Sequence, residues 1–246
     1  MSQVVSVISG KGGTGKTSLC AGIASCLAAE GSRVLCIDAD VGLRNLDISL
    51  GMSDEPILPF TSVMRGEYAL ESAAAHPMIP NLFLLTAPVT EAAEELDKDQ
   101  FGALLDAARE RFDWVLLDAP AGIGAGFRLA TDFADQALVI AASDPASLRD
   151  AARATDVLLK NRPSIEARLI VNRVRPALYR RMQATVDDIM DGVGLPLLGI
   201  VPEDSGVTLA AAQGAALVLY TENGAARACL NIARRLSGRK IPLMMR

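Results

Sequence analysis

Gly10-Lys11-Gly12-Gly13-Thr14-Gly15-Lys16-Thr17 forms a segment rich in glycine and lysine near the N-terminus of the chain. It fits the pattern G-x-x-x-x-G-K-[ST], in which glycines let backbone N–H groups curl around phosphate oxygens. A β-rich apolar run, residues 4–8, precedes the stretch, and an apolar pattern of helical spacing, residues 19–27, follows it. A helix there would aim its N-terminal N–H groups and the positive end of its dipole at the phosphates. The sequence therefore predicts a phosphate-binding loop between a strand and a helix.

The two lysines of this loop are expected to have different tasks. Lys16 is placed to reach the β- and γ-phosphates of a nucleotide, and the Thr17 hydroxyl is placed to hold a Mg²⁺ ion. Neither task needs Lys11. Two interpretations of Lys11 are open at this point: a solvated surface lysine, or a lysine that reaches a phosphate bound by a second subunit. The loop by itself does not separate them.

The composition favours a cytoplasmic α/β protein with one well-buried core. The chain has 246 residues, 50% of them hydrophobic, and a mean hydropathy of +0.28. No apolar stretch approaches the ~20 residues that cross a bilayer, so we assign the apolar residues to a core. The N-terminus runs straight into a predicted strand, which leaves no room for a signal peptide. The cysteines lack metal-ligand spacing and are predicted to be buried in a reducing compartment: Cys20, Cys26, Cys36 and Cys229.

Charge and aromatic content argue against a main task in nucleic-acid binding. The net charge is −5 and the isoelectric point is about 5.0, which disfavours a protein that coats DNA. Aromatic residues make up 4% of the chain, too few for base-stacking platforms. The only histidine, His76, precedes Pro77 in a predicted loop. We expect His76 to be solvated and not catalytic.

Short β-rich runs alternate with helical patterns, which is typical of a parallel sheet with right-handed crossovers. Strands are predicted at residues 3–9, 33–38, 82–86, 114–118, 136–141, 167–173 and 197–201. Helices are predicted at residues 16–30, 99–112, 126–133, 146–160, 181–192, 206–213 and 225–236. Residues 52–80 carry four prolines and are predicted to be irregular, with short helices. We predict one α/β domain over residues 1–246, a phosphate-loop fold with a mostly parallel twisted sheet of seven or eight strands and helices on both faces.

Carboxylates follow two of the predicted strands, at the end where ligands bind in open α/β folds. Asp38 and Asp40 come after the second strand, and Asp118 ends the fourth. A carboxylate there can organise metal-bound water or orient the water that attacks the γ-phosphorus. The alternative for Asp38 is structural, a cap or turn at the end of the strand. Residues 120–124 form a hinge-like stretch able to sense the γ-phosphate.

Together these motifs resemble the deviant phosphate-loop ATPases of the MinD/ParA family. The resemblance extends over nearly the whole chain and rests on residues 10–17, Asp38-Ala39-Asp40-Val41-Gly42-Leu43-Arg44-Asn45-Leu46-Asp47, Asp118-Ala119-Pro120-Ala121-Gly122 and Val201-Pro202-Glu203-Asp204. The first two motifs are specific. The resemblance implies a Mg-dependent ATPase that hydrolyses ATP to ADP and phosphate and acts as an ATP-dependent dimerisation switch. The process it implies is spatial regulation of bacterial cell division, that is, septum-site selection.

The resemblance also implies catalytic and metal-binding roles. Lys11 would reach across the dimer to the partner's phosphates, so that hydrolysis depends on dimerisation as with an arginine finger in trans. Lys16 would bind the phosphates of its own subunit, and Asp40 would position the attacking water. The Mg²⁺ shell would be served by Thr17, Asp38 and Asp118, with the carboxylates acting through water.

Nucleotide contacts are implied for the loop, the residue after it and two groups on the adenine side. These positions are Gly10, Lys11, Gly12, Gly13, Thr14, Gly15, Lys16, Thr17, Ser18, Asn172, Arg173, Pro202, Glu203 and Asp204. Asn45 would lie near the dimer seam. Arg149 and Asp150 begin a helix that in the family lies at the dimer edge, where regulators dock. For the adenine-side and helix positions, an ordinary loop or helix start is the alternative.

The chain departs from the family pattern at several positions. Thr14 stands where an aliphatic residue is common, Ser18 where a second threonine is common, and Gly124 where glutamate is frequent. Family members carry a short amphipathic tail beyond the point where this chain stops, so we expect that membrane-targeting tail to be absent or truncated. Residues 229–236 are predicted to be a docked core helix, because their apolar residues suit one face of a buried helix.

The leading hypothesis is a cytoplasmic ATPase that forms a homodimer when ATP is bound and interacts with division-site regulators. Contact with an anionic membrane, at the inner face of the cell membrane, is left open. The second hypothesis is a ParA-like ATPase that positions DNA, a flagellum or other cargo. DNA binding would need a basic face, and five arginines in a mixed segment are usually solvated: Arg168, Arg173, Arg175, Arg180 and Arg181.

Two further functional classes share this fold or could use its nucleotide site. An iron–sulfur reductase of the same fold is excluded, because residues 118–150 contain no cysteine. A scaffold that binds ATP without hydrolysing it stays open, and loss of phosphate release in Asp40→Ala would exclude it.

Overall fold

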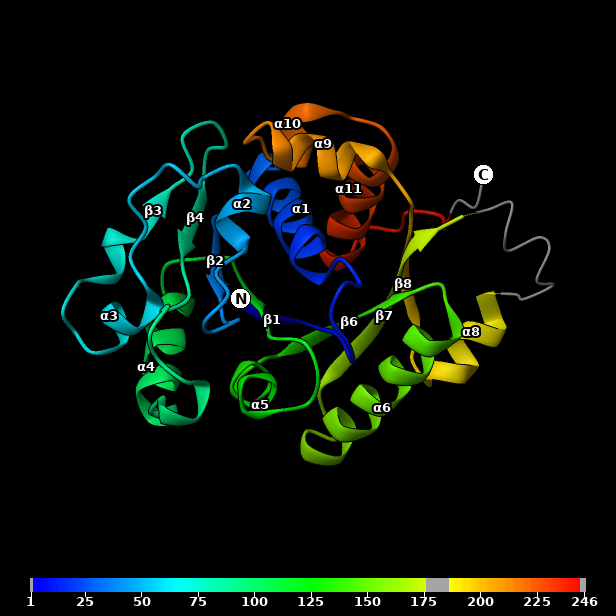
Figure 1. The fold of residues 1–246 in the computed structure, drawn as a ribbon, viewed down its shortest axis with the longest axis horizontal. Helices are drawn as coiled ribbons and strands as arrows, with labels where there is room; N and C mark the ends of the chain where they lie inside the picture. Colours follow the sequence, from blue (N-terminus) through cyan, green and yellow to red (C-terminus); the bar gives the residue numbers. More distant parts are fainter. Residues whose placement is uncertain (1, 176–185, 244–246) are drawn as a thin grey trace.

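The computed structural model describes residues 2–175 and 186–243 and has an eight-stranded sheet at its centre (Figure 1). The strand order is β3-β4-β2-β5-β1-β6-β7-β8. The strands are β1 (Gln3–Ile8), β2 (Val34–Asp38), β3 (Ala74–Ala75), β4 (Leu82–Leu85), β5 (Trp114–Asp118), β6 (Gln136–Ala142), β7 (Glu166–Val174) and β8 (Leu197–Pro202). Neighbouring strands pair in parallel, except β3, which pairs antiparallel with β4. This is the predicted mostly parallel sheet.

Helices cover both faces of the sheet as two layers (Figure 1). One layer holds α1 (Lys16–Ala29), α2 (Leu46–Leu50), α9 (Ser205–Ala212), α10 (Leu217–Tyr220) and α11 (Gly224–Leu236). The other layer holds α3 (Phe60–Met64), α4 (Lys98–Arg109), α5 (Ala125–Asp132), α6 (Pro145–Asn161) and α8 (Val186–Val193). Two short 3₁₀ helices, η1 (Leu70–Ser72) and η2 (Ala93–Glu95), lie in the connections.

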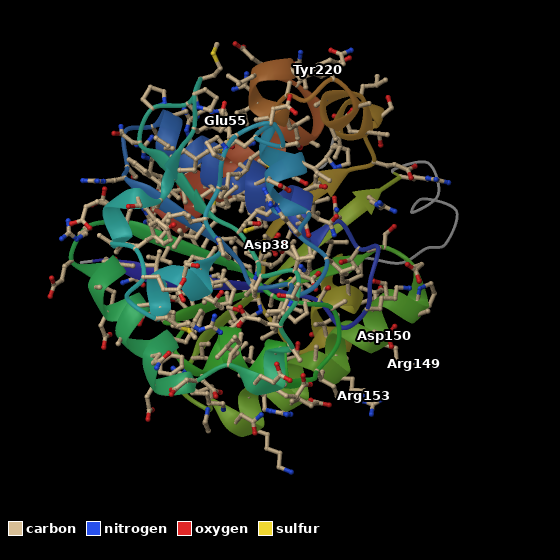
Figure 2. All side chains as sticks on the ribbon, turned by 60° about the vertical axis from the view of Figure 1, so that its left-hand side comes forward. Asp38, Glu55, Arg149, Asp150, Arg153 and Tyr220 are labelled. Atoms are coloured by element: carbon tan, nitrogen blue, oxygen red, sulfur yellow. The ribbon has the colours of Figure 1, made fainter. Side chains whose placement is uncertain are left out.

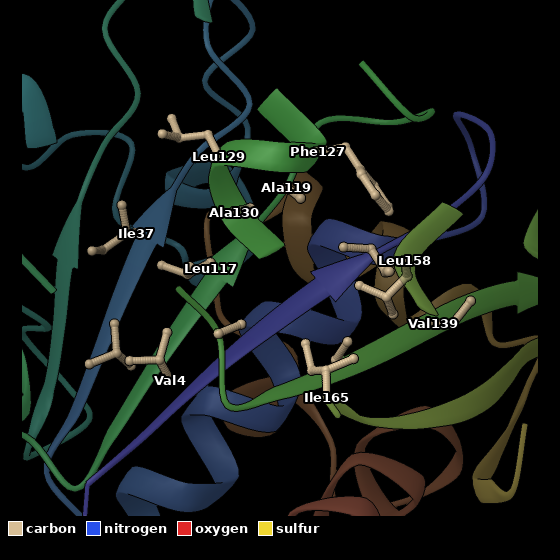
Figure 3. Close-up of a cluster of buried hydrophobic side chains, with 14 of the residues drawn as sticks. Val4, Ile37, Leu117, Ala119, Phe127, Leu129, Ala130, Val139, Leu158 and Ile165 are labelled. Atoms are coloured by element: carbon tan, nitrogen blue, oxygen red, sulfur yellow. The ribbon is translucent and has the colours of Figure 1, made fainter. Parts of the chain in front are cut away.

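Apolar side chains fill the space on both sides of the sheet, because parallel strands are shielded on both faces. Alternate residues of β1 face opposite layers: Val4 lies in the cluster with α5 and α6, and Val5 in the cluster with α1 and α11. Figure 3 shows the first cluster, where Phe127 of α5 and Leu158 of α6 lie over the strands. This packing fixes the strands relative to one another, so the loops at their carboxyl ends meet at one edge of the sheet.

The predicted strands and long helices are confirmed, with differences in a few places. Residues 52–80, predicted to be irregular with short helices, contain α3 and η1 and also the short strand β3. The sequence did not indicate α2 and α10, which have five and four residues, because helical periodicity needs a longer window. The helix predicted from residue 181 is described from Val186, and its start lies outside the described residues.

The cysteines and the histidine are both buried. All four cysteines are free and buried, as predicted. The prediction that His76 is solvated is wrong. Its side chain is 7% exposed, and both ring nitrogens lie within hydrogen-bonding distance of backbone groups. The turn between β3 and β4 places it against the end of α2, a tertiary contact that local sequence does not report.

Candidate nucleotide-binding site

The phosphate loop joins the carboxyl end of β1 to the first turn of α1, as predicted. Gly13 and Gly15 have φ angles of +77° and +88°, in the left-handed region that favours glycine. Gly15 precedes α1, and no side-chain hydrogen bond in the described structure caps that helix. The first N–H groups of α1 are therefore free to donate to an anion. A side chain at Gly10 would collide with the backbone oxygen of Asp150, 2.0 Å from the added Cβ, so the loop and the start of α6 lie against each other.

Lys16 is the buried cation of the loop. Its ammonium lies 2.6 Å from Oδ1 of Asp118, and its side chain is 6% exposed. Asp118, the last residue of β5, is fully buried, and its Oδ2 has no hydrogen-bond partner among the described residues. Burial raises the pKa of Asp118, and the charge of Lys16 opposes that shift. An unsatisfied buried carboxylate oxygen is unusual in proteins and marks a position that a water or ion would satisfy.

Asp38 holds the loop that leads from β2 into α2. Its Oδ1 accepts a hydrogen bond from the backbone N–H of Asp40 at 3.0 Å, and its Oδ2 accepts from those of Asn45 at 3.0 Å and Leu46 at 3.1 Å. Asp38 and Asp118 are neighbours in the register of β2 with β5. The structural alternative considered for Asp38 is therefore present, since it caps α2.

The three carboxylates at this edge of the sheet repel one another. Burial, followed by the charge of Asp118, raises the pKa of Asp38 to about 6. Burial also raises the pKa of Asp40, whereas the charge of Lys16 lowers it. A divalent cation would relieve this repulsion. The described residues contain no cluster of three His, Cys, Asp or Glu side chains placed to hold a metal ion. Mg²⁺ takes oxygen ligands, keeps several waters and usually binds through one or two carboxylates together with phosphates. The hard oxygen donors present, including the free Oδ2 of Asp118, fit Mg²⁺.

Lys11 lies at the open side of the loop. Its side chain is 35% exposed, and its ammonium is 3.2 Å from Oδ1 of Asp144. Asp144 is the N-cap of α6, where the same oxygen accepts the N–H of Ser147 at 2.9 Å. The hydrogen bond from Ser147, followed by that from Lys11, lowers the pKa of Asp144. In this single subunit Lys11 is therefore held by its own chain at the edge of α6.

The predicted adenine-side residues line one cavity together with the phosphate loop. The cavity has a volume of about 500 Å³, within the range of small-molecule sites. Its wall includes Gly15, Ser18, Asn172, Arg173, Pro202, Glu203 and Asp204. Asn172 donates from Nδ2 to the backbone oxygen of Thr14 at 2.8 Å, which ties β7 to the loop and leaves its Oδ1 as an acceptor. Arg173 has a φ of +54°, a strained conformation for a non-glycine residue.

Two carboxylates of this wall are already engaged within the chain. Asp204 accepts the N–H of Gly206 on Oδ1 and that of Ala225 on Oδ2, both at 2.8 Å, so it caps α9 and ties it to α11. Glu203 forms an ion pair with Arg175, and that pairing lowers the pKa of Glu203. Asp204 is thus a wall residue whose oxygens are occupied, whereas Pro202 and Asn172 present groups that a base can contact.

The predicted interface residues lie at the rim of the site. Asn45 is exposed just before α2, with its backbone N–H bound to Asp38. Figure 2 shows Asp38 in the interior, and Arg149 and Asp150 on α6. Of the arginines weighed for DNA binding, Arg168 and Arg175 pair with Glu166 and Glu203. Arg180 and Arg181 lie outside the described residues.

Sequence reasoning missed several residues of the site. Asp144, the partner of Lys11, was not singled out, although an Asp followed by Pro145 is a typical N-cap signature. Val207, Thr208 and Leu217 also line the cavity. No signal in the sequence indicated these three, because α9 and α10 reach the cavity only through the packing of α11 and β8.

Comparison with a protein-family model identifies the chain over most of its length. Residues 5–218 match the model described as CobQ/CobB/MinD/ParA nucleotide binding domain. The chain is 36% identical to the septum site-determining protein MinD of Synechocystis sp. over 247 aligned residues, covering 99% of this chain and 92% of that protein. It is 33% identical to MinD of Bacillus subtilis, covering 100% of this chain and 92% of that protein.

Solved structures lead to the same family. MinD in the MinC:MinD cell division protein complex of Aquifex aeolicus matches with a TM-score of 0.91 at 33% identity, over 99% of both chains. These relatives confirm the predicted membership of the MinD/ParA family and the predicted fold class. They also confirm the ATPase activity with ATP/ADP and Mg²⁺ and the role in septum-site selection. In the described residues, no helix is both long and apolar enough to span a membrane. The chain belongs to the CobQ/CobB/MinD/ParA family of nucleotide-binding domains, among its septum site-determining MinD ATPases.

Proposed function

We propose that this ATPase works as a homodimer that closes when ATP binds and opens after hydrolysis. The observation that carries the proposal is the placement of the two lysines of the phosphate loop. Lys16 is buried on Asp118 and serves the nucleotide of its own subunit, whereas Lys11 is exposed at the open rim. A cation at that rim is within reach of a nucleotide presented by a facing subunit. The residue assignments below belong to this proposal.

Nucleotide binding would use the loop, the first turn of α1 and the 500 Å³ cavity. Backbone N–H groups of residues 10–17 donate to the phosphates, and the ammonium of Lys16, held in place by Asp118, also binds the β- and γ-phosphates. Asn172 and Pro202 flank the base, with Glu203 and Asp204 completing that wall. A solved MinD of Pyrococcus horikoshii, 27% identical with a TM-score of 0.82 over 96% of both chains, is complexed with Mg-ADP.

Hydrolysis would depend on positioning more than on a strong base. Asp40, half-buried beside Asp38, orients the attacking water. Thr17 through its hydroxyl, and Asp38 and Asp118 through water, would hold Mg²⁺, which offsets charge on the phosphate oxygens when it is bound. Asp38 also accepts the N–H groups at the start of α2. Binding of nucleotide and metal at this site would therefore act directly on the position of the loop that carries Asn45.

Partner contacts are proposed for the rim formed by Asn45 and the start of α6. The Aquifex relative was solved with MinC, which supports a division-site regulator as partner. Arg149 and Asp150 are offered as the docking edge, since the backbone of Asp150 lies directly against Gly10 of the loop. A regulator bound there would contact the element that supports the phosphate loop. Lys11 must leave Asp144 before it can cross to a partner subunit.

Contact with the inner face of the cell membrane receives little support from the basic cluster at the end of α11. Arg234 and Arg239 pair with Glu30, the residue that follows α1. Arg235 donates to the backbone oxygens of Leu198, Ile241 and Pro242. Cations committed to the fold attract anionic lipid weakly, so we propose that membrane contact by the described residues is weak.

The test compares the mass of the protein with ATP and with ADP by light scattering, in wild type and in Asp40→Ala. We expect a monomer with ADP, a dimer with ATP, and a longer-lived dimer in Asp40→Ala because hydrolysis is slowed. Pelleting with anionic liposomes and with DNA under the same nucleotides separates membrane from DNA partners. A wild-type protein that stays monomeric with ATP while hydrolysing it would overturn the dimer proposal.

A further inference from the structure

His76 is a buried titratable group with no place in the chemistry above. It lies between β3 and β4, and its backbone N–H donates to the oxygen of Leu82 at 2.8 Å. Its Nε2 is 2.9 Å from the backbone oxygen of Leu50, and its Nδ1 faces the backbone N–H groups of Met78 at 3.0 Å and Ile79 at 3.1 Å. We call this ring with its three backbone partners the His76 clip.

The contacts of the clip select one form of the imidazole. Backbone N–H groups can only donate, so Nδ1 must be the bare, accepting nitrogen. The proton then lies on Nε2, which donates to the oxygen of Leu50. A second proton on Nδ1 would point at two N–H donors and could not coexist with these contacts. The observed arrangement therefore requires neutral histidine.

The clip fixes the carboxyl end of α2. Leu50 is the last residue of this five-residue helix, whose final carbonyl groups have no partner within the helix. The other end of α2 is fixed by Asp38 through the N–H groups of Asn45 and Leu46. Asp38 belongs to β2, β2 pairs with β4, and β4 binds the backbone of His76. Contacts thus run in a closed ring from Asp38 through α2 to His76 and back through the sheet.

The surroundings of the ring favour its neutral form. Burial lowers the pKa of His76, while the hydrogen bond to Leu50 and the charge of Glu55 oppose that shift. Glu55, in the segment after α2, is a charged side chain whose field opposes the lowering of the pKa of His76. The hydrogen-bond partners of the ring come from α2 and from the turn at residues 77–79, and all three are backbone groups.

We propose that His76 is a positioning residue of the ATPase site, whose neutral ring fixes α2 and thereby holds Asp38 and Asp40, and whose protonation in mild acid releases them. His76 acts through the Leu50 carbonyl, α2 and the hydrogen bonds to Asp38. The inference rests on the proposed roles of Asp38 and Asp40 in hydrolysis. The alternative is a histidine that only stabilises the fold.

The first arm of the test observes the ring directly. His76 is the only histidine of the chain, so ¹⁵N-histidine labelling of the whole protein gives one imidazole to follow by NMR. We expect the Nε2–H tautomer at neutral pH and a protonation midpoint below the ordinary value of 6.5. An Nδ1–H tautomer, or a protonation midpoint at or above 6.5, would contradict the hydrogen bonds of the His76 clip. This result would not depend on ATP hydrolysis.

The second arm measures kcat and ATP affinity in variants. His76→Ala should lower kcat by about two- to tenfold, the range that corresponds to one lost hydrogen bond, and leave ATP affinity at the phosphate loop unchanged. His76→Gln offers an amide N–H near the Nε2 position and does not titrate, so it should restore most of the lost kcat. Met78→Ala is the matched control, because the clip uses only the backbone of this exposed residue.

The pH dependence separates positioning from simple stabilisation. Wild type and His76→Gln share the same active-site carboxylates, so the ratio of their kcat values cancels the titration of those groups. We expect a constant ratio at neutral pH and above, and a falling ratio in mild acid as the pH approaches the lowered pKa of the wild-type ring. If the ratio did not change with pH, or if kcat per folded molecule were unaffected in His76→Ala, His76 would have only a structural role. If Asp40→Ala hydrolysed ATP normally, the site assignment would fail while the NMR result for the clip stood.

Discussion

Two lysines five residues apart in the phosphate loop have opposite surroundings. Lys16 is almost fully buried and lies 2.6 Å from a carboxylate that is itself buried, Asp118. Lys11 is about one-third exposed and lies 3.2 Å from Asp144, which is about half exposed. Both are lysine–aspartate pairs, and both partners are over 100 residues away in the sequence. Their main difference is burial.

The difference shows how one loop combines a fixed and a movable cation. A buried pair is costly to break because the remaining charge is left without water, whereas an exposed pair contributes little to stability. Lys16 is therefore fixed within the phosphate loop, where we propose that it binds the nucleotide of its own subunit, and Lys11 can leave Asp144 at small cost. The geometry suits a cation that changes partners when a second subunit arrives.

Replacing Lys16 should have the largest effect. Lys16→Met keeps the bulk of the side chain and leaves Asp118 buried without its cation, which costs about 3–5 kcal/mol of unfolding free energy. ATP affinity should fall by about 100-fold or more, the scale for losing one preorganised donor to phosphate charge. Chemical denaturation and nucleotide titration measure the two effects. Lys98→Met, at an exposed pair with Asp132, is the matched control and should change neither.

The stability loss in Lys16→Met should depend on pH. Without Lys16, the burial of Asp118 is unopposed, and its folded-state pKa rises further above the unfolded value. A carboxyl whose pKa is raised by folding contributes most below its unfolded pKa, and that contribution is lost as pH rises through the folded value. The deficit relative to wild type should therefore be smaller at about pH 5 than at about pH 8. A deficit independent of pH would mean that Lys16 does not compensate Asp118.

Replacing Lys11 should separate function from stability. Lys11→Ala removes only an exposed pair, so unfolding free energy should change by less than about 0.5 kcal/mol. ATP should still bind the monomer, because Lys16 is intact. ATP-dependent dimerisation should weaken, and turnover should fall on the order of 100-fold. This loss of turnover is smaller than the largest effect of removing an arginine finger, because each loop keeps Lys16. Light scattering measures the dimerisation, and phosphate release measures the turnover, with Lys160→Ala as the control. A Lys11→Ala protein that dimerised and hydrolysed ATP normally would contradict the prediction.

The sequence allowed the local parts of this site to be predicted. The phosphate loop is a continuous motif between a strand and a helix, and both neighbours were evident from apolar periodicity. Asp38 and Asp118 could be placed at one edge because parallel strands share a carboxyl end. The helix α11 was predicted as a docked core helix, and its apolar residues do face the sheet.

Long-range pairing could not be predicted from local patterns. The contact of Lys11 with Asp144 joins residues 133 positions apart, and it depends on how α6 packs on β6, the strand next to β1 in the sheet. The burial of His76 depends on the turn after β3 lying under α2, a helix too short to leave a periodic signal. Asp204 lines the cavity, and the binding of its two oxygens to the N–H groups at the starts of α9 and α11 follows from tertiary packing.

Replacing Thr14, which lies between the two lysines, tests what burial costs a polar group that has no partner. Its side chain is buried, and Oγ1 has no hydrogen-bond partner among the described residues. Thr14→Val replaces the hydroxyl with a methyl group of similar size, which should raise unfolding free energy by about 1 kcal/mol. ATP affinity should be unchanged, because Asn172 binds only the backbone oxygen of Thr14. Thermal melts of the nucleotide-free protein measure the gain, and a destabilised variant would mean that the hydroxyl has a partner.

Asp144→Asn should have the smallest effect, and it tests directly whether the exposed pair restrains Lys11. Asparagine is as good an N-cap as aspartate, so the hydrogen bond from Ser147 and the start of α6 should persist. The ionic hold on Lys11 is lost, which corresponds to about 0.2–1 kcal/mol for an exposed pair. If leaving Asp144 is a step in dimer formation, the ATP concentration at half-maximal dimerisation should fall by about twofold, and the shift should shrink as salt screens the wild-type pair. An unchanged midpoint at low salt would show that Lys11 moves freely in the monomer, and its exposed position alone would then explain its role.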